Sequence, residues 1–281
     1  MKPFTYHAPT TVDEAVAMLE QYQSSCAVVA GGTDVIIELN ERHKTPAHVI
    51  AIDKLSELRY IKEEEGLVKI GALTTFDDLE NDAYVQEHLP ALWETAVHVG
   101  SPQIRNLGTV GGNVVNASVA GDSPTTFLTY GAQVVLKSAG GERVMTIEDF
   151  NKGPGNCAIR PDELLTEIRF PALSGDEAVG YFKIGKRKSL AIVVLAVAIY
   201  IKRTPDNKVE DCRVVLGAVS KHPMRSPELE ALLKGRALTR QSLDDTLPAF
   251  TDAVQAAIPT RPSVVYKREG VRGAARRWFD Q

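Results

Sequence analysis

The chain is poor in cysteine, and this excludes several classes of protein. It has 281 residues and only three cysteines, Cys26, Cys157 and Cys212, which lie far apart. An odd number at such spacing does not support a disulfide framework, and no C-x-x-C pair offers a zinc or iron–sulfur site. We therefore expect no metal site and a reducing, cytoplasmic location.

The sequence also lacks a long hydrophobic run. The longest, LAIVVLAVAIYI, extends only from Leu190 to Ile201, whereas a membrane-spanning helix needs roughly 20 apolar residues. Its β-branched residues predict a buried strand instead. The N-terminal residues MKPFTYHAPTT contain no apolar segment typical of a secretory signal. We expect no membrane span.

An excess of basic charge is missing too, because the formal net charge is −4 at pH 7. Proteins that bind nucleic acid usually carry a basic stripe, so we expect no nucleic-acid partner. There is no G-x-G-x-x-G for a Rossmann site and no G-x-S-x-G for a hydrolase triad. Residues 180–186 fit G-x-x-x-x-G-K, but Arg187 stands where a P-loop has Ser or Thr. The six histidines show no metal-ligand spacing.

The N-terminal half has the pattern of a mixed α/β layer. Thr11 and Glu14 form a capping-box pattern that predicts a helix through Tyr22. Residues 26–30, 48–53 and 67–72 read as strands. Three helices are predicted besides the first: one that opens at Asp34, a short one capped by Thr74 and Asp77, and one over residues 83–99.

The second half of the sequence predicts a domain boundary, followed by an antiparallel sheet and helices. Strands are predicted over residues 133–137 and 163–170, and residues 171–180 have a loop-like composition that marks a domain boundary. Beyond it, residues 181–186, 191–201 and 210–219 predict three consecutive strands of an antiparallel sheet. Helices are expected from about Pro227, Arg240 and Ser263 to the end of the chain.

Two glycine pairs have a similar makeup. Gly31 and Gly32 follow a predicted strand and precede Thr33, while Gly111 and Gly112 lie between Thr109 and Asn113. Unpaired N–H groups at the start of a helix attract phosphate, and glycine lets a ligand approach the main chain. Each pair is either a tight turn or one side of a site for a ligand with two phosphates. The residues alone leave both readings open.

Four segments together resemble a known family. They are VVAGGTDVI (28–36), SPQIRNLGTVGGNVVNASVAGDSP (101–124), FKIGKRKSLAIV (182–193) and YKREGVRGAARRWF (266–279). They are similar to the FAD-binding medium subunit of the molybdenum hydroxylases, the group that includes xanthine dehydrogenase and aerobic carbon monoxide dehydrogenase. The resemblance covers essentially the whole chain, and the two glycine motifs together are specific.

The resemblance implies an α+β fold with two domains. The first, residues 1–173, would be a two-subdomain FAD-binding domain of the vanillyl-alcohol-oxidase or PCMH type. The second, residues 174–281, would be a C-terminal domain in which a small antiparallel sheet packs with helices. The implied function is that of an oxidoreductase subunit that binds FAD and transfers electrons.

The resemblance also implies which residues hold the cofactor, and no residue of this chain would act on the organic substrate. The first motif would wrap the FAD pyrophosphate, with the N–H groups of Gly31, Gly32 and Thr33 as donors. The second motif would clasp the other side, Asp122 would contact the cofactor, and Leu165 and Val99 would lie near the flavin ring. Lys183 would place a positive charge near the ring, where it favours the anionic reduced flavin, although an ordinary exposed lysine on a strand is the alternative. The full set is Val28, Val29, Ala30, Gly31, Gly32, Thr33, Asp34, Val35, Val99, Thr109, Val110, Gly111, Gly112, Asn113, Asp122, Leu165 and Lys183.

The implied partners are a large molybdopterin-binding subunit and a small subunit with two [2Fe–2S] clusters, in a dimer of heterotrimers. Electrons from these clusters would reach FAD and pass to an acceptor such as NAD. Two alternatives stay open: a stand-alone FAD-dependent oxidase, and a scaffold subunit that has lost its flavin. The intact glycine motifs argue against the scaffold.

Overall fold

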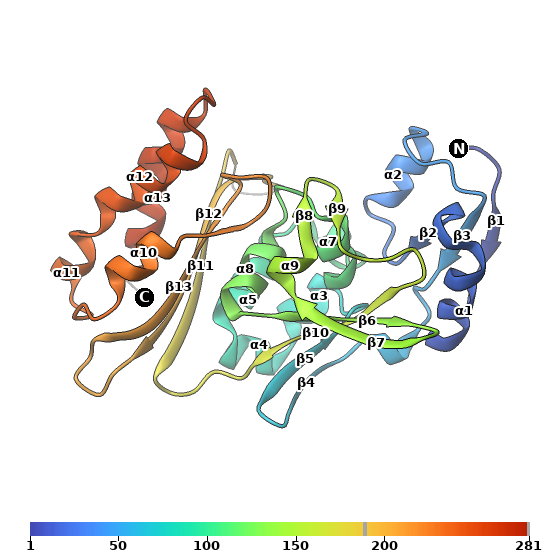
Figure 1. Ribbon diagram of the computed structural model, residues 1–281, viewed down its shortest axis with the longest axis horizontal. Helices are drawn as coiled ribbons and strands as arrows, with labels where there is room; N and C mark the ends of the chain where they lie inside the picture. The colour runs from blue at the N-terminus through green and yellow to red at the C-terminus, as the bar shows by residue number, and fades with distance from the viewer. Residues whose placement is uncertain (188–189, 280–281) are drawn as a thin grey trace. The chain divides into compact units, whose positions relative to one another are not determined.

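The computed structural model describes residues 1–187 and 190–279, which form two compact units (Figure 1). Unit 1 consists of Met1–Leu79, Ser101–Ala117 and Ala132–Ala172. Unit 2 consists of Glu80–Gly100, Ser118–Gly131 and the described chain from Leu173 onward. The units are therefore interleaved along the chain, and the domain boundary after residue 173 stays a prediction.

Unit 1 begins with a parallel sheet covered by one helix. Its strands lie in the order β1 (Thr5–His7), β3 (His48–Ala51) and β2 (Cys26–Val29), and its helix is α1 (Val12–Tyr22). The Thr11 hydroxyl accepts a hydrogen bond from the Glu14 N–H, as the capping pattern predicts. The buried face of α1 packs with residues of β3 and the loop after it: Val12, Ala15, Val16, Leu19, Ile50 and Ile52. The predicted helix and the predicted strands over residues 26–30 and 48–53, which are β2 and β3, are confirmed.

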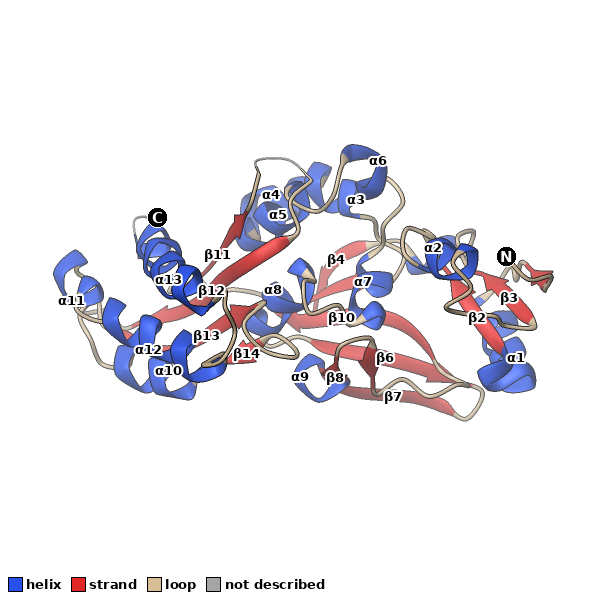
Figure 2. Ribbon diagram, turned by 90° about the horizontal axis from the view of Figure 1, so that it is seen from above, coloured by secondary structure: helices blue, strands red, loops and turns tan. Residues whose placement is uncertain are grey.

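A second sheet of unit 1 has five antiparallel strands. Their order is β4 (Ile61–Glu64), β5 (Leu67–Gly71), β10 (Leu164–Pro171), β6 (Gln133–Ser138) and β7 (Gly141–Thr146). Figure 1 labels all five strands, and Figure 2 shows β4, β10, β6 and β7 in red. The short helix α9 (Ile147–Phe150) and the hairpin of β8 (Asn151–Gly153) and β9 (Asn156–Cys157) follow β7. The strands predicted over residues 67–72, 133–137 and 163–170 are the inner strands β5, β6 and β10 of this sheet. The edge strands β4 and β7 were not predicted, because exposed charged residues along them hide the strand pattern.

The remaining helices of unit 1 are short. They are α2 (Val35–Asn40), α3 (Phe76–Asn81, which runs on into unit 2), α6 (Pro102–Arg105) and α7 (Val110–Asn116), with 3-10 turns at Gln23–Ser25 and Ser56–Leu58. The predicted cap of α3 by Thr74 and Asp77 is wrong by one residue. The Thr75 hydroxyl accepts from the Asp78 N–H, and the Asp78 carboxylate accepts from the Thr75 N–H. Thr74 is used elsewhere, since its hydroxyl donates to the Tyr60 carbonyl.

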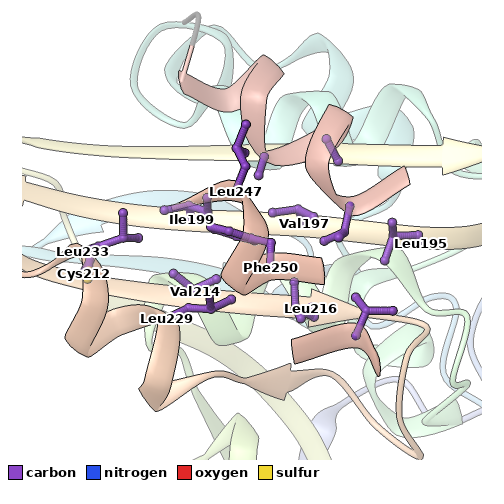
Figure 3. Close-up of a cluster of buried hydrophobic side chains, with 14 of the residues drawn as sticks. Leu195, Val197, Ile199, Cys212, Val214, Leu216, Leu229, Leu233, Leu247 and Phe250 are labelled. Carbon is purple, nitrogen blue, oxygen red and sulfur yellow. The ribbon is translucent and has the colours of Figure 1, made fainter. Parts of the chain in front are cut away.

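Unit 2 contains one antiparallel sheet with helices on both faces. The strands β11 (Glu177–Gly185), β12 (Val193–Arg203), β13 (Val209–Gly217) and β14 (Met224–Arg225) lie in chain order. One face carries α10 (Pro227–Leu233), α11 (Arg240–Asp244), α12 (Leu247–Ala257) and α13 (Val264–Phe279). Figure 3 shows alternate residues of β12, namely Leu195, Val197 and Ile199, pointing into this core beside Phe250. The predicted antiparallel strands and C-terminal helices are confirmed.

The other face of this sheet is covered by α5 (Pro90–Val97) and α8 (Asp122–Tyr130). Small residues let α8 approach closely, because a Cβ at Gly217 would lie 2.7 Å from the Thr125 hydroxyl oxygen. The helix predicted over residues 83–99 is in fact two, α4 (Ala83–His88) and α5, which break at Pro90 because proline has no N–H to continue the helix. Helix α8 was missed because its threonines have low helix propensity, and burial of every residue stabilises it instead.

Within the described residues no helix is long and apolar enough to cross a membrane. The same residues contain no group of three or more His, Cys, Asp or Glu side chains that could hold a metal ion. The cytoplasmic location stays a prediction.

The ion pair between Glu163 and Arg143 gives a prediction for acid stability. Arg143 donates from Nε and Nη2 to the two carboxylate oxygens, at 2.9 and 2.7 Å, and the Arg160 N–H donates at 2.8 Å. Burial raises the pKa of Glu163, but Arg143 and the Arg160 N–H outweigh it, so the pKa is lowered. The stabilisation is therefore present above the unfolded pKa of about 4.3 and is lost as the pH falls through the folded pKa.

We expect Glu163→Gln to lower the free energy of unfolding at pH 7 by about 1–3 kcal/mol, because the partly exposed Arg143 guanidinium loses the charge of the buried Glu163 carboxylate. The difference in free energy of unfolding between the variant and wild type should become smaller below about pH 4. Urea unfolding between pH 3 and 7 measures both effects. Glu64→Gln, on the exposed edge of the same sheet, is the control and should unfold like wild type. If the stability difference between Glu163→Gln and wild type did not change with pH, the role given to the Glu163–Arg143 ion pair would be contradicted.

Candidate cofactor site

The predicted cofactor residues are divided between the two units. Unit 1 holds residues 28–35, residues 109–113 and Leu165. Unit 2 holds Val99, Asp122 and Lys183. Unit 1 packs the first glycine motif against Leu107 and Gly108, which lead into the second motif, and unit 2 brings Asp122 and Lys183 together.

The first glycine motif forms a loop whose N–H groups have no partner in the protein. Strand β2 ends at Val29, and α2 begins at Val35 after Asp34, whose side chain makes no capping bond. Between them, the backbone N–H groups of residues 30–35 donate no hydrogen bond to any described residue, and the first N–H that does is that of Ile36, to the Gly32 carbonyl. Gly32 has φ +73°, a conformation that glycine adopts without strain. Such a series of N–H groups is suited to bind phosphate oxygens.

Gly31 is required by the protein's own backbone. A Cβ at this position would lie 1.7 Å from the carbonyl oxygen of Leu107. The next residue, Gly108, is close to the first motif as well, since a Cβ there would lie 3.7 Å from the Thr33 hydroxyl oxygen. The loop of residues 30–35 therefore packs against the segment that leads into the second motif.

The second glycine motif uses its N–H groups differently. Thr109 caps α7, and its hydroxyl accepts from the Gly112 N–H at 3.1 Å while its carbonyl accepts from the Asn113 N–H at 3.0 Å. The Val110 and Gly111 N–H groups donate to the carbonyls of Thr74 and Ala72, at 2.9 and 3.0 Å. All four N–H groups at the start of the helix are therefore already bonded, so this motif can reach a ligand only through its side chains or with loss of these bonds.

Gly111 also faces the protein rather than open space. A Cβ there would lie 2.7 Å from both the Cβ and the carbonyl oxygen of Ala72. At Gly112 a Cβ would meet only the Thr109 hydroxyl oxygen, at 2.9 Å. The two glycine pairs are alike in sequence, but each contains one glycine that its own unit requires for packing.

Leu165 is fully incorporated in unit 1. It lies on β10 opposite Leu136 of β6, next to a β-bulge before Glu167, and is 3% exposed. Its predicted contact with the flavin ring stays a prediction. In unit 2, Val99 follows α5, and its N–H donates to the Ala96 carbonyl.

Asp122 and Lys183 form a buried ion pair in unit 2. The Lys183 ammonium donates to Asp122 Oδ2 at 2.7 Å, and the two side chains are 6% and 8% exposed. Lys183 also donates to the His98 carbonyl at 3.0 Å, and Tyr181 donates its hydroxyl to Asp122 Oδ1. The alternative that Lys183 is an ordinary exposed lysine is therefore wrong.

The pair changes the electrostatic expectation for Lys183. The Asp122 carboxylate compensates the ammonium charge, so the lysine is not an isolated cation. Burial raises the pKa of Asp122, against the opposing effects of the Lys183 charge and the hydrogen bonds from Lys183 and Tyr181. Burial and the Asp122 charge also raise the pKa of Tyr181 well above its ordinary value, so its hydroxyl remains a donor.

Tyr181 was not predicted from the sequence. A usable signal was present, because Tyr181 and Lys183 are two residues apart in a predicted strand and therefore share a face. Their common partner, Asp122, could not be found this way, since it lies about 60 residues earlier in the chain in a helix that the sequence pattern did not reveal.

Two family models and several known proteins match the chain along most of its length. The family described as the FAD binding domain in molybdopterin dehydrogenase matches residues 2–173, and the CO dehydrogenase flavoprotein C-terminal domain matches residues 180–281. The chain is 41% identical to the nicotinate dehydrogenase FAD-subunit of Eubacterium barkeri, over 99% of this chain and 96% of that one. It is 33% identical to the xanthine dehydrogenase FAD-binding subunit of Escherichia coli O157:H7, over 92% and 87%.

Solved structures are similar as well. A chain of carbon monoxide dehydrogenase from Hydrogenophaga pseudoflava, in a form that lacks the Mo-pyranopterin moiety of the molybdenum cofactor, superposes with a TM-score of 0.88 at 32% identity. The superposition covers 99% of this chain and 96% of that chain.

The packing of the second motif predicts unequal effects for its two glycines. Gly111→Ala should lower the free energy of unfolding by about 1–3 kcal/mol, because the new Cβ forces α7 away from Ala72. Gly112→Ala should cost clearly less, because its Cβ meets only a hydroxyl that can rotate. Thermal and urea unfolding of the two variants measure the difference, and equal losses would contradict the packing role given to Gly111.

Proposed function

Since the chain belongs to the family of FAD-binding medium subunits of the molybdenum hydroxylases, we propose that it holds FAD as the electron-transfer subunit of such an enzyme. Bound FAD supplies two-electron redox chemistry to an oxidoreductase. The residues of the chain contribute binding, orientation and electrostatics.

The observation that carries the proposal is the series of unbonded N–H groups in residues 30–35. A pyrophosphate has two negatively charged phosphates, each with oxygens that accept several hydrogen bonds. Unpaired N–H groups would gain these bonds without losing any made within the protein. We assign the pyrophosphate to this loop, with Gly31, Gly32 and Thr33 as donors flanked by Val28, Val29, Ala30, Asp34 and Val35.

The other predicted residues have different roles in this proposal. Thr109 and Asn113 would reach the cofactor through side chains, because the N–H groups of residues 110–113 are bonded within unit 1. Val110, Gly111 and Gly112 would hold α7 in place. Leu165, Val99, Asp122 and Lys183 remain proposed contacts of the cofactor, and Lys183 would act as a hydrogen-bond donor rather than as an isolated cation.

We further propose a place for the subunit in a complex. Its electron donor would be a small subunit with [2Fe–2S] clusters, and a large molybdopterin-binding subunit would oxidise the organic substrate. The relatives described as FAD subunits of nicotinate and xanthine dehydrogenase support this. The acceptor would be a soluble oxidant such as NAD, and the assembly would be a dimer of heterotrimers.

The phosphate assignment is tested by comparing two glycines that share a backbone conformation. Gly32 and Gly66 have φ +73° and +75°, so the backbone strain of alanine is similar at both. At Gly32 the new Cβ would also lie 3.0 Å from Cγ1 of Ile36, whereas at Gly66 nothing lies within 4 Å. We expect Gly32→Ala to weaken FAD binding about tenfold or more, because the strained loop misdirects its N–H groups. Gly66→Ala, in the turn between β4 and β5, should bind FAD like wild type. Titration of the apoprotein with FAD measures both affinities, and equal affinities would contradict the assignment.

The electron-transfer role is tested with the purified full chain. Paired visible flavin bands, with about one FAD released per chain on denaturation, are expected from the one-cofactor fold. Anaerobic addition of NADH should bleach these bands if NAD is the acceptor. A colourless chain that takes up no added FAD would refute the cofactor role, whereas a coloured chain that NADH does not bleach would refute only the proposed acceptor.

A further inference from the structure

Both oxygens of the buried Asp122 carboxylate are held by one strand. Tyr181 and Lys183 alternate on β11 and point to the same side. The tyrosine hydroxyl donates to Oδ1 and the lysine ammonium donates to Oδ2. Asp122 is the first residue of α8, so these two bonds fix the carboxylate plane between strand and helix.

The carboxylate in turn fixes the ammonium group. Lys183 has three N–H donors, of which one reaches Asp122 and one reaches the His98 carbonyl. The third makes no hydrogen bond to a described residue. Because the ammonium is tetrahedral, two fixed donors set the direction of the third. A rotation of the Asp122 carboxylate would therefore redirect the remaining donor of Lys183.

We propose that Tyr181 is a positioning residue of the FAD site, which acts through Asp122 to aim the free N–H of Lys183 at the cofactor. This rests on the proposed function, in which Asp122 and Lys183 contact FAD. Tyr181 itself does not need to touch the cofactor. Without its hydroxyl, Oδ1 would be left buried and unsatisfied, and the carboxylate would turn or take up a proton.

The charges around Asp122 give the proposal a pH dependence. The groups that face it are Tyr181 and Lys183 from β11, and His98 at the end of α5; Glu94, also from α5, acts on Tyr181. Burial raises the pKa of Asp122, while Lys183, Tyr181 and His98 lower it. Loss of the Tyr181 hydroxyl removes one lowering effect, so the pKa of Asp122 rises further. The carboxylate of the variant therefore takes up a proton more readily as the pH falls, which leaves Lys183 without its counter-charge.

The test is a pH series of FAD titrations on the full-length apoprotein, with a matched control. Tyr181→Phe should weaken FAD binding about tenfold, with the loss growing as the pH is lowered. Tyr200→Phe is the control, because Tyr200 also donates to a carboxylate of the same sheet, that of the partly buried Glu177. It should lower the melting temperature comparably and leave FAD affinity unchanged at every pH. Melting curves and circular dichroism establish that each variant is folded.

A double-mutant cycle separates positioning from general stability. If Tyr181 acts through Asp122, Tyr181→Phe should have no further effect on FAD affinity in an Asp122→Asn background. A full additional loss there, or a pH-independent loss equal to that of Tyr200→Phe, would overturn the positioning role. If Asp122→Asn weakens FAD binding but Tyr181→Phe binds like wild type, the inference fails and the proposed site stands. If Asp122→Asn, Lys183→Met and Tyr181→Phe all bind like wild type, the proposed unit 2 contacts fail as well.

Discussion

Close backbone contact around residues 71–76 is the constraint on which the candidate phosphate site depends. This segment accepts the N–H groups of Val110 and Gly111, donates from Phe76 to the Gly108 carbonyl, and donates from Ala72 to the Thr166 carbonyl of β10. These bonds place α7 and the residues before it, against which Gly31 packs without a Cβ. The loop of residues 30–35 takes no part in this bonding, and its N–H groups donate to no described residue.

Local patterns predicted the elements whose signals lie within a few residues. The capped helix α1, the inner strands of both sheets and the long apolar strand β12 follow from side-chain periodicity. Other elements were missed. Helix α8 is stabilised by burial against strands that come later in the chain. The edge strands β4 and β7 carry exposed charged residues that hide the strand pattern. In the candidate site, too, local features were predicted and features that depend on distant contacts were not. The glycine motifs were found from sequence, but their different use of N–H groups depends on Ala72 and Thr74, which no spacing rule connects to residues 110 and 111.

The electrostatics of unit 2 illustrate why a charged residue cannot be interpreted alone. Lys183 in the sequence is an isolated cation on a strand, and its charge predicts an effect on the flavin. In the fold its partner Asp122 cancels most of that charge, and the pair is buried with its remaining hydrogen bonds supplied by Tyr181 and a backbone carbonyl. A buried ion pair of this kind contributes little net stability. Its main effect is to hold the two charged groups in a fixed position. The ammonium is held at fixed orientation in an environment of low polarity, where a directed hydrogen bond is strong.

The interleaved order of the units has a consequence for how the protein is made. Helices α5 and α8 belong to unit 2, yet the ribosome releases them before β11, β12 and β13 have been synthesised. All nine residues of α8 are buried in the finished protein, so during elongation their apolar side chains have no sheet to cover them. The nascent chain must therefore complete its C-terminal third before unit 2 can close. Over that interval, shielding by chaperones and the speed of translation bear directly on yield.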